Sequence, residues 1–316
     1  MTGSGVLVTG GAGFIGSHLV DLLISKGHVV YVLDDLSSGT LDNLASVMDE
    51  PNFKFIRGDI RNPIEDSVNP SSMGGGPGIE AVFHLGARVD VTTSMEDPMG
   101  DAAVNYIGTI NVLNFALKKG VRSVIYSSSA AVYGDTADIP VRETAPKHPL
   151  SPYGLHKLSS ERMMDIFSDV YGMSCSSLRF FNVYGPRQDS NSPYAGVISL
   201  FLDKAGKGDP LLIYGDGSQT RDFIHVSDIS AALYTAYVDN LKGVYNVGTG
   251  VETSLLDLAD MLDRISGRKL RRIFMPARKG EIERSVASID KLRVAAGFSP
   301  GIELLQGLKD TYRHRS

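Results

Sequence analysis

The most constraining feature of this 316-residue chain is a glycine-rich turn set directly between a short apolar strand and a helix. The stretch Gly5–Thr9 is typical of a buried strand, and it runs into Gly10-Gly-Ala-Gly13-Phe-Ile-Gly16. Gly10 allows a tight turn, Gly13 lets the backbone approach a pyrophosphate, and Gly16 lets the helix pack on the strand. The pattern therefore predicts a phosphate-binding turn.

The residues around this turn supply the context that a dinucleotide site requires. Phe14 and Ile15 begin an amphipathic helix, and the unpaired N–H groups of its first turn would face the phosphates. A second apolar strand follows at 28–33 and ends in Asp34. The alternative is a flexible turn without a ligand, but these neighbours favour a dinucleotide site.

Asp34 and the residues after it indicate which dinucleotide is bound. A carboxylate at the tip of the second strand can accept both hydroxyls of the adenosine ribose, whereas it would repel a 2′-phosphate. Asp35 follows, and no arginine occurs until Arg57, so we expect NAD rather than NADP. A solvated acidic loop is the alternative. Asp59 and Ile60, after a third strand at 53–56, are the expected adenine contacts.

A second candidate site lies in the stretch Ser151–Lys157. Tyr153 and Lys157 are four residues apart, so a helix would place both on one face. Lowering the pKa of a tyrosine from near 10 to about 7 requires about 4 kcal/mol of preferential stabilisation of the phenolate. A close ammonium and the positive ring of an oxidised nicotinamide could supply it. The same spacing also occurs by chance on solvated helix faces.

Ser129 is a third candidate, because it ends an apolar strand at 124–129. In an open α/β sheet, ligands bind at the carboxyl ends of the strands. A serine there could hydrogen-bond a sugar hydroxyl and pass its proton to Tyr153. The alternative is a serine turn that closes the strand.

Strand and helix patterns alternate along the first part of the chain, which predicts an α/β fold with a doubly wound, Rossmann-type parallel sheet. We expect strands near 5–9, 28–34, 53–58, 80–85, 121–127 and 174–180, and a short one at 244–247. After residue 182 the alternation is lost, and one clear helix is expected at 255–266. The predicted domains are an NAD-binding domain of 1–181 plus about 222–248, and a smaller α+β substrate-binding cap of about 182–221 plus 249–316.

Composition narrows the function classes. The net charge of −5 argues against nucleic acid as the main partner. No apolar run approaches 18 residues and no secretory signal is evident, so we expect a cytoplasmic protein without a membrane span. The single cysteine, Cys175, excludes an internal disulfide and a cysteine-based metal cluster. No metal site is expected.

Taken together, the motifs resemble the extended short-chain dehydrogenase/reductase family, in particular its nucleotide-sugar 4-epimerase branch. The resemblance covers nearly the whole chain. It is carried by Thr9-Gly-Gly-Ala-Gly-Phe-Ile-Gly16, His84-Leu-Gly-Ala87, Asn105, Ser127-Ser-Ser-Ala-Ala-Val-Tyr-Gly134, Tyr153-Gly-Leu-His-Lys157, Arg179-Phe-Phe-Asn-Val-Tyr-Gly-Pro-Arg187 and Gly215-Asp-Gly-Ser-Gln-Thr-Arg-Asp-Phe-Ile-His-Val-Ser-Asp228.

The resemblance implies 4-epimerisation of a UDP-hexose, with NAD as a bound catalyst and a transient 4-keto sugar. Tyr153 would take the proton of the sugar 4-hydroxyl, Ser129 would orient that hydroxyl, and Lys157 would bond the nicotinamide ribose. The resemblance adds further cofactor contacts at Leu85, Gly86, Ala87 and Asn105.

The resemblance also implies a set of substrate-binding residues in the second part of the chain. Asn182, Arg221 and Arg278 would hold the UDP, with Glu281 three residues after Arg278. Two arginine forks can pair bidentately with diphosphate oxygens. Val197 and Tyr214 could flank the uracil. Ser285 corresponds to a position that lines the hexose pocket, where a bulky tyrosine excludes a 2-acetamido group.

Among the related activities, a dehydratase is disfavoured and two alternatives stay open. The 4,6-dehydratases of the family need an Asp-Glu pair where this chain has Ala130-Ala131, and alanine cannot shuttle protons. A UDP-glucuronate 4-epimerase shares the motifs, and Arg187 is a candidate partner for the sugar carboxylate. A catalytically silent NAD-sensing protein on the same fold is the alternative from another class.

The helices expected near 101–119 and 151–171 carry apolar residues beyond one core-facing stripe. These residues are Ile107, Ile110, Phe115, Met163, Ile166 and Phe167. Helices of this kind usually pair, and the alternative is that all six side chains face the sheet. With the resemblance, the pattern predicts a homodimer through a four-helix bundle.

Overall fold

The computed structural model describes residues 5–189, 196–277 and 282–315, which form two compact units. The first unit comprises the chain up to Tyr133, Lys147–Arg179 and Ser230–Tyr245, and the second comprises Gly134–Pro146, Phe180–Ile229 and the chain from Asn246 on. The predicted division assigned 134–146, 180–181, 222–229 and 246–248 to the first domain, whereas these residues lie in the second unit. Residues 134–146 belong to the second unit, in which Val141 exchanges backbone hydrogen bonds with Val286 and Ser288.

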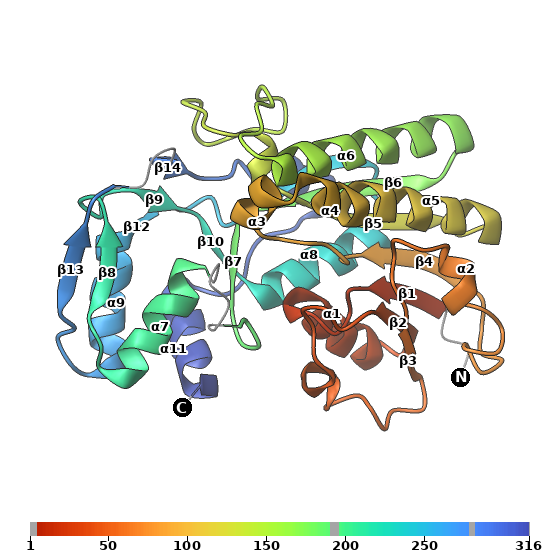
Figure 1. Cartoon of the computed structure of the whole chain (residues 1–316), viewed down its shortest axis with the longest axis horizontal. Helices are drawn as coiled ribbons and strands as arrows, with labels where there is room; N and C mark the ends of the chain where they lie inside the picture. The colour runs from red at the N-terminus through yellow and green to blue at the C-terminus, as the bar shows by residue number, and fades with distance from the viewer. Residues whose placement is uncertain (1–4, 190–195, 278–281, 316) are drawn as a thin grey trace. The chain divides into compact units, whose positions relative to one another are not determined.

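A seven-stranded sheet organises the first unit, and it confirms the predicted α/β, doubly wound fold (Figure 1). Its order is β11-β6-β5-β4-β1-β2-β3. The strands β2 and β3 extend the sheet on one side of β1, and β4, β5, β6 and β11 extend it on the other side. The pairings of β1 with β2 and β4, of β2 with β3 and of β4 with β5 are parallel. The strands are β1 (Gly5–Thr9), β2 (Val29–Asp34), β3 (Phe53–Arg57), β4 (Ile79–His84), β5 (Ser123–Ser129), β6 (Ser174–Phe180) and β11 (Gly243–Val247).

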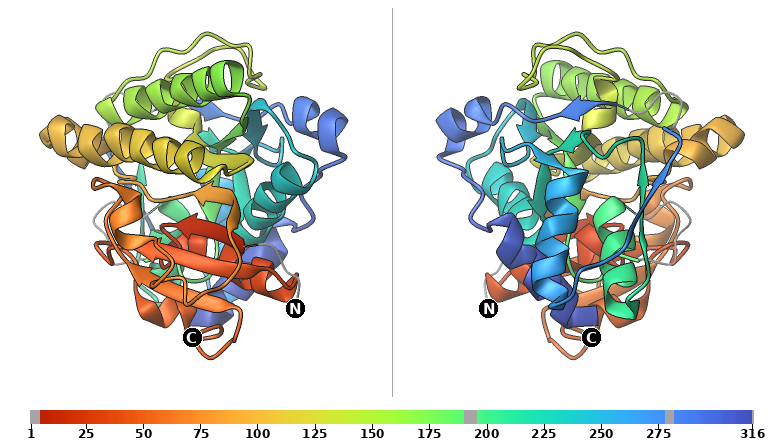
Figure 2. Two further views of the ribbon diagram at one scale, coloured as in Figure 1. Left: turned by 90° about the vertical axis from the view of Figure 1, so that its right-hand side faces the viewer. Right: turned by 90° about the vertical axis from the view of Figure 1, so that its left-hand side faces the viewer.

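The helices of the first unit cover both faces of this sheet (Figures 1 and 2). Because side chains alternate along a strand, Leu7 and Val82 face a core under α5 and α6, whereas Phe83 packs against Tyr237 of α8. The helical segments are α1 (Phe14–Ser25), η1 (Leu41–Leu44), α2 (Ile64–Ser67), α3 (Val91–Glu96), α4 (Pro98–Ala102), the π-helical η2 (Ala103–Ile107), α5 (Gly108–Lys119), η3 (Ala130–Val132), α6 (Pro152–Tyr171) and α8 (Val226–Val238), which enters this unit at Ser230. None of the described helices is long and apolar enough to cross a membrane.

The second unit is built from short strands and helices around a separate apolar core. Parallel pairs join β7 (Asn182–Tyr184) to β10 (Phe223–His225) and β8 (Leu211–Tyr214) to β13 (Arg272–Met275), while β9 (Thr220–Arg221) lies between β12 (Thr253–Ser254) and β14 (Arg284–Ser285). The helices are α7 (Val197–Lys207), α9 (Leu255–Ser266), α10 (Asp290–Ala296) and α11 (Leu304–Arg315). The predicted helix at 255–266 is α9, which begins with a capping box between Ser254 and Asp257.

Candidate functional site

The glycine turn leaves no room for side chains at two of its three predicted glycines. Gly10 has φ +70°, and a Cβ atom there would lie 2.6 Å from the Gly86 nitrogen. A Cβ atom at Gly16 would lie 2.1 Å from the Gly10 oxygen. At Gly13 a Cβ atom would meet only the Gly10 oxygen, at 3.3 Å. Gly10 and Gly16 are therefore required for packing, whereas Gly13 leaves open backbone that a pyrophosphate can approach.

The start of α1 adds a positive end to this turn. Gly13 precedes Phe14, and no side chain caps the helix there. The first N–H groups of a helix, here those of Phe14 and Ile15, have no partner within it and carry the positive end of the helix dipole. An anion at this turn would satisfy them.

Asp34 closes the turn from the neighbouring strand. Its Oδ2 accepts a hydrogen bond of 2.9 Å from the Ala12 N–H, and its Oδ1 accepts one of 2.8 Å from the Leu36 N–H. Burial raises the pKa of this carboxyl, while the two backbone N–H groups oppose the rise. Each carboxylate oxygen keeps a second lone pair, so Asp34 can shape the turn and still accept ribose hydroxyls. Asp35 accepts from Ser37 N–H at 2.9 Å.

The residues after β4 lie against the glycine turn, and Ile60, after β3, lies against Gly86 and the start of α5. Gly86 donates its N–H to Thr9 Oγ1 at 3.2 Å, which sets Leu85–Ala87 beside Gly10. Ile60 is buried, and its Cδ1 lies 2.8 Å from where a Cβ atom of Gly108 would stand. The Asp59 carboxylate is held by Arg61 at 2.5 Å, and this contact lowers its pKa.

Asn105 is committed to holding the loop that follows β4. Its Nδ2 donates to the Arg88 carbonyl and to Asp101 Oδ2, both at 2.9 Å, and its Oδ1 accepts from the Arg88 N–H at 3.1 Å. Both amide protons are thus used within the protein. Asn105 fixes the loop containing the predicted cofactor contacts Leu85, Gly86 and Ala87.

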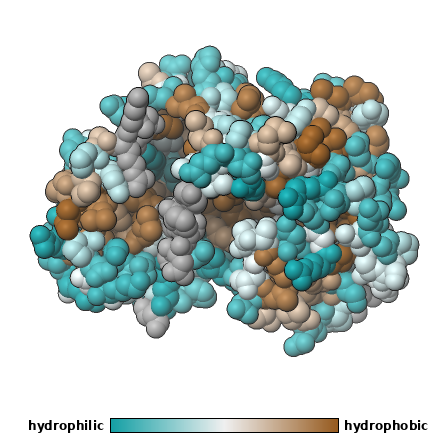
Figure 3. All heavy atoms as spheres, in the orientation of Figure 1, coloured by the Kyte–Doolittle hydropathy of each residue, from teal (hydrophilic) through white to brown (hydrophobic). Residues whose placement is uncertain are grey.

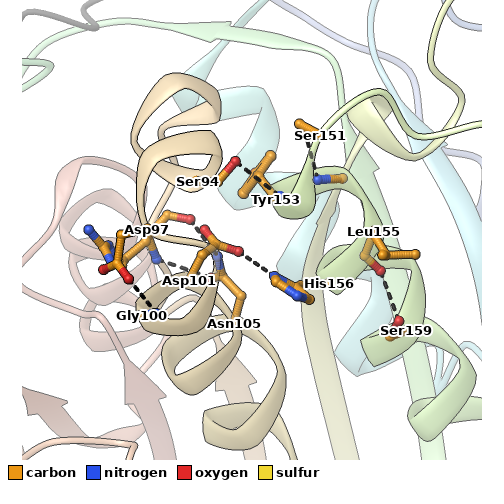
Figure 4. A network of polar contacts seen from close by, with 12 residues as sticks. Ser94, Asp97, Gly100, Asp101, Asn105, Ser151, Tyr153, Leu155, His156 and Ser159 are labelled. Atoms are coloured by element: carbon orange, nitrogen blue, oxygen red, sulfur yellow. Dashed lines mark hydrogen bonds and ion pairs between the residues drawn. The ribbon is translucent and has the colours of Figure 1, made fainter.

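The three predicted catalytic residues come from the end of β5 and the start of α6. Ser129 ends β5, and its hydroxyl lies close enough to the Tyr153 phenol to lower the pKa of that phenol. The Tyr153 backbone N–H donates to Ser94 Oγ at 3.2 Å (Figure 4). Lys157 Nζ donates to the Ser127 carbonyl at 2.8 Å and lies 5.8 Å from the centre of the Tyr153 ring.

Burial is the largest influence on the pKa values of Tyr153 and Lys157. Burial raises the pKa of the Tyr153 phenol to about 12. The neighbouring Ser129 hydroxyl opposes this rise, and the Asp101 charge adds to it. Burial also lowers the pKa of Lys157 to about 7. A further positive charge is required to lower the pKa of Tyr153.

Sequence reasoning missed a buried ion pair behind these residues. Arg179 Nε and Nη2 bind Glu161 Oε1 and Oε2 at 2.8 and 2.6 Å, and both side chains are almost fully buried. Arg179 also donates to the Tyr133 hydroxyl at 2.7 Å, and Ser128 Oγ donates to Glu161 Oε1 at 2.5 Å. Glu161 follows Lys157 by one helical turn, which is the signal that could have identified it.

In the second unit the structure brings together three of the predicted substrate residues. Arg221 and Ser285 are register partners in the parallel pair of β9 and β14. Asn182 donates its Nδ2 to the carbonyl of Asp222, the residue next to Arg221, at 3.2 Å. Val197 begins α7 and Tyr214 ends β8. Arg278 and Glu281 lie outside the described residues.

Asp222 orders the backbone around this group and was not singled out from the sequence. Its buried carboxylate accepts hydrogen bonds from the Thr249 N–H, the Thr249 hydroxyl, the Gly250 N–H and the Ala287 N–H, at 2.6 to 3.0 Å. Burial raises the pKa of Asp222, and these bonds oppose the rise. Asp222 thus holds the backbone at Thr249, Gly250 and Ala287 close to the strand pair that contains Arg221 and Ser285.

Proteins similar to this chain along nearly its whole length are known. The profile of the NAD dependent epimerase/dehydratase family matches residues 6–248. A putative UDP-glucose 4-epimerase of Methanocaldococcus jannaschii is 39% identical over 307 residues, covering 96% of each chain. The structure of UDP-glucose 4-epimerase from Thermotoga maritima with UDP-glucose aligns with a TM-score of 0.91 and 37% identity over 98% of both chains. That of UDP-N-acetylglucosamine 4-epimerase from Methanobrevibacter ruminantium, in complex with UDP-N-acetylmuramic acid, aligns with a TM-score of 0.92 and 34% identity over 100% of this chain and 99% of the other.

Proposed function

Because this chain belongs to the NAD-dependent epimerase/dehydratase family, and NAD is therefore its cofactor, we propose that it is a UDP-hexose 4-epimerase. The proposed substrates are UDP-glucose and UDP-galactose, and also UDP-N-acetylglucosamine and UDP-N-acetylgalactosamine. One observation carries the proposal. Ser129 at the end of β5 acts on the Tyr153 phenol at the start of α6, and Lys157 Nζ lies 5.8 Å from the centre of the Tyr153 ring.

The residues of the first unit fit NAD. The open backbone at Gly13 and the start of α1 would bind the pyrophosphate, Asp34 would accept the adenosine ribose hydroxyls, and Lys157 would bond the nicotinamide ribose. Bound there, NAD supplies a reversible hydride acceptor for C4 of the sugar. Tyr153, whose pKa burial raises, would lose its proton more readily beside the positive ring of the oxidised cofactor.

In the proposed reaction Tyr153 takes the proton of the sugar 4-hydroxyl, which Ser129 orients, and C4 becomes a ketone. The sugar turns, and Tyr153 returns the proton after hydrogen has returned to the opposite face of C4. Arg221 and Arg278 would grip the diphosphate far from C4, so the hexose stays free to turn. After Ser129 the chain continues with Ala130 and Ala131 in η3, which offer no carboxyl group for a dehydration.

A panel of UDP-sugars tests this function. Purified protein is incubated with UDP-glucose, UDP-galactose, their N-acetyl forms and UDP-glucuronate, and the products are resolved by NMR. We expect interconversion within the neutral and N-acetylated pairs. Turnover of UDP-glucuronate alone would replace the proposal by a uronate epimerase, with Arg187 as a candidate partner for the carboxylate. Bound NAD without turnover of any sugar would indicate the catalytically silent sensor.

Ser285 is proposed to set the size of the accepted hexose. It is half-buried and is the register partner of Arg221. We expect Ser285→Tyr to abolish epimerisation of UDP-N-acetylglucosamine while UDP-glucose is still converted, because a close-packed pocket does not absorb an added aromatic ring. Kinetics with both substrates measure this, and Ser285→Ala, which keeps the position small, is the control. Equal loss of both activities, or loss of neither, removes Ser285 from the specificity argument.

We also propose a homodimer through α5 and α6, which lie side by side (Figure 2). Large apolar side chains are exposed on these helices and at the end of η2, and hydrophobic residues reach the surface there (Figure 3). They are Ile107, Leu117, Leu155, Ile166, Val170 and Tyr171. The prediction that Phe115 and Phe167 belong to this surface was wrong, because both are buried against the sheet.

Light scattering at micromolar concentration tests the dimer. The wild type should have the mass of two chains, and the double variant Ile166→Lys with Val170→Lys should have the mass of one, because burying two charges in a helical bundle is costly. Val294→Lys changes an exposed apolar residue on α10 in the same way and should leave the mass unchanged. A wild type of monomeric mass contradicts the proposal.

A further inference from the structure

A buried carboxylate on α4 faces a histidine on the catalytic helix. Asp101 is 1% exposed, and its Oδ1 lies 2.6 Å from Nδ1 of His156, whose side chain is 16% exposed (Figure 4). His156 stands between Tyr153 and Lys157 on α6. Asp101 Oδ2 accepts from Asn105, which holds the loop after β4. The pair therefore ties α6 to the segment that lies beside the glycine turn.

Two other charged groups in the segments around Tyr153 and Lys157 have partners of opposite charge, and burial together with the Lys157 charge lowers the pKa of His84 on β4 to about 3. Arg88 pairs with Asp97 at 2.8 Å at the start of α4, and Glu161 pairs with Arg179. From β5, the neutral Tyr126 ring lies under Lys157 Nζ, 4.8 Å from it. The partner of Asp101 differs from these, because an imidazole carries a positive charge only when it is protonated.

We propose that Asp101 and His156 form a positioning pair, in which His156 orients the buried carboxylate and, when protonated, cancels its charge beside Tyr153 and Lys157. The inference rests on the proposed function, in which Tyr153 is the base. Both residues act through Tyr153 and Lys157 and do not contact the sugar.

The sign of the effect follows from the charge. The negative Asp101 raises the pKa of both Tyr153 and Lys157, because it opposes the phenolate and favours the ammonium. A protonated His156 offsets that charge. Tyr153 then loses its proton more easily, so His156 extends activity toward lower pH. Without the carboxylate, the pH range of activity should move to lower pH as a whole.

The pH profile of kcat in single and double variants tests this coupling. Asp101→Asn keeps hydrogen-bonding atoms for Asn105 and His156 but removes the charge, and we expect the acid limb to move down by about 0.5 to 1 pH unit. His156→Gln keeps a hydrogen-bond donor but cannot be charged, and we expect the acid limb to move to higher pH. The double variant should follow Asp101→Asn, because His156 acts through Asp101. Profiles that change only in height, or single variants that move in the same direction, overturn the proposal.

A second readout does not depend on catalysis. In protein labelled with ¹³C-lysine, the Cε shift of Lys157, assigned by comparison with Lys157→Met, reports the titration that burial places at about 7. Asp101→Asn should lower this midpoint. Asp169→Asn, the same change at an exposed site on α6 three turns beyond Lys157, should leave it unchanged. An unmoved midpoint in an active epimerase overturns the pair alone, whereas a lowered midpoint without epimerase activity overturns the proposed function and leaves the electrostatic coupling standing.

Discussion

Tyr153→Phe lowers the turnover of UDP-glucose by about 10² to 10⁴, the usual scale for a positioned acid–base group. The change removes the phenol oxygen that neighbours Ser129 and leaves the buried ring in place. The glycine turn, Asp34 and Lys157 are unaltered, so NAD should remain bound. Steady-state kcat measures the loss of turnover, and the NAD content of the purified protein shows whether the cofactor stays bound.

Tyr31→Phe is the matched control for Tyr153→Phe. It removes a tyrosine hydroxyl from the same unit, where Tyr31 bonds the Pro77 carbonyl at 3.0 Å. Loss of one such bond costs about 1 kcal/mol of stability and should leave kcat within a factor of two or so. If Tyr153→Phe kept half of the wild-type activity, Tyr153 would not be the base.

Arg179→Leu lowers the free energy of unfolding by about 3 to 5 kcal/mol, measured by urea denaturation. The substitution leaves the Glu161 carboxylate, which is 2% exposed, without its cationic partner beneath the catalytic residues. It also removes a donor from the Tyr133 hydroxyl. The cost arises mainly from the uncompensated buried charge.

Two variants separate this cause from a general loss of packing. Removing both charges, in Arg179→Leu with Glu161→Leu, should cost less than Arg179→Leu alone, because no buried charge is left unpaired. Arg162→Leu breaks the exposed pair with Asp165, at 3.2 Å, and should cost less than about 1 kcal/mol. A double variant that is less stable than Arg179→Leu contradicts this account.

The elements that sequence reasoning located correctly depend on local patterns. The glycine turn was identified because a strand, three spaced glycines and a helix follow one another within a few residues. The strands of the sheet were placed to within about two residues, since buried parallel strands are short apolar runs bounded by polar residues. The helix α9 was placed correctly because its cap and apolar spacing lie within a single segment.

What sequence reasoning missed depends on contacts between distant segments. Asp101 and His156 are 55 positions apart, and Glu161 and Arg179 belong to a helix and a strand, so no spacing rule joins them. The effect of burial, which lowers the pKa of Lys157, is likewise not revealed by the spacing of Lys157 to Tyr153. Phe115 and Phe167 were placed on a surface because apolar content alone does not tell which helix face meets the sheet.

The most direct test of the proposed chemistry follows the hydrogen at C4. UDP-glucose deuterated at C4 is incubated with the wild-type protein in unlabelled water, and the UDP-galactose formed is analysed by NMR and mass spectrometry. The account predicts that the product keeps its deuterium at C4, because the hydrogen removed from one face is returned to the other without exchange with water. UDP-galactose that has lost the deuterium to solvent, or no UDP-galactose at all, would contradict it.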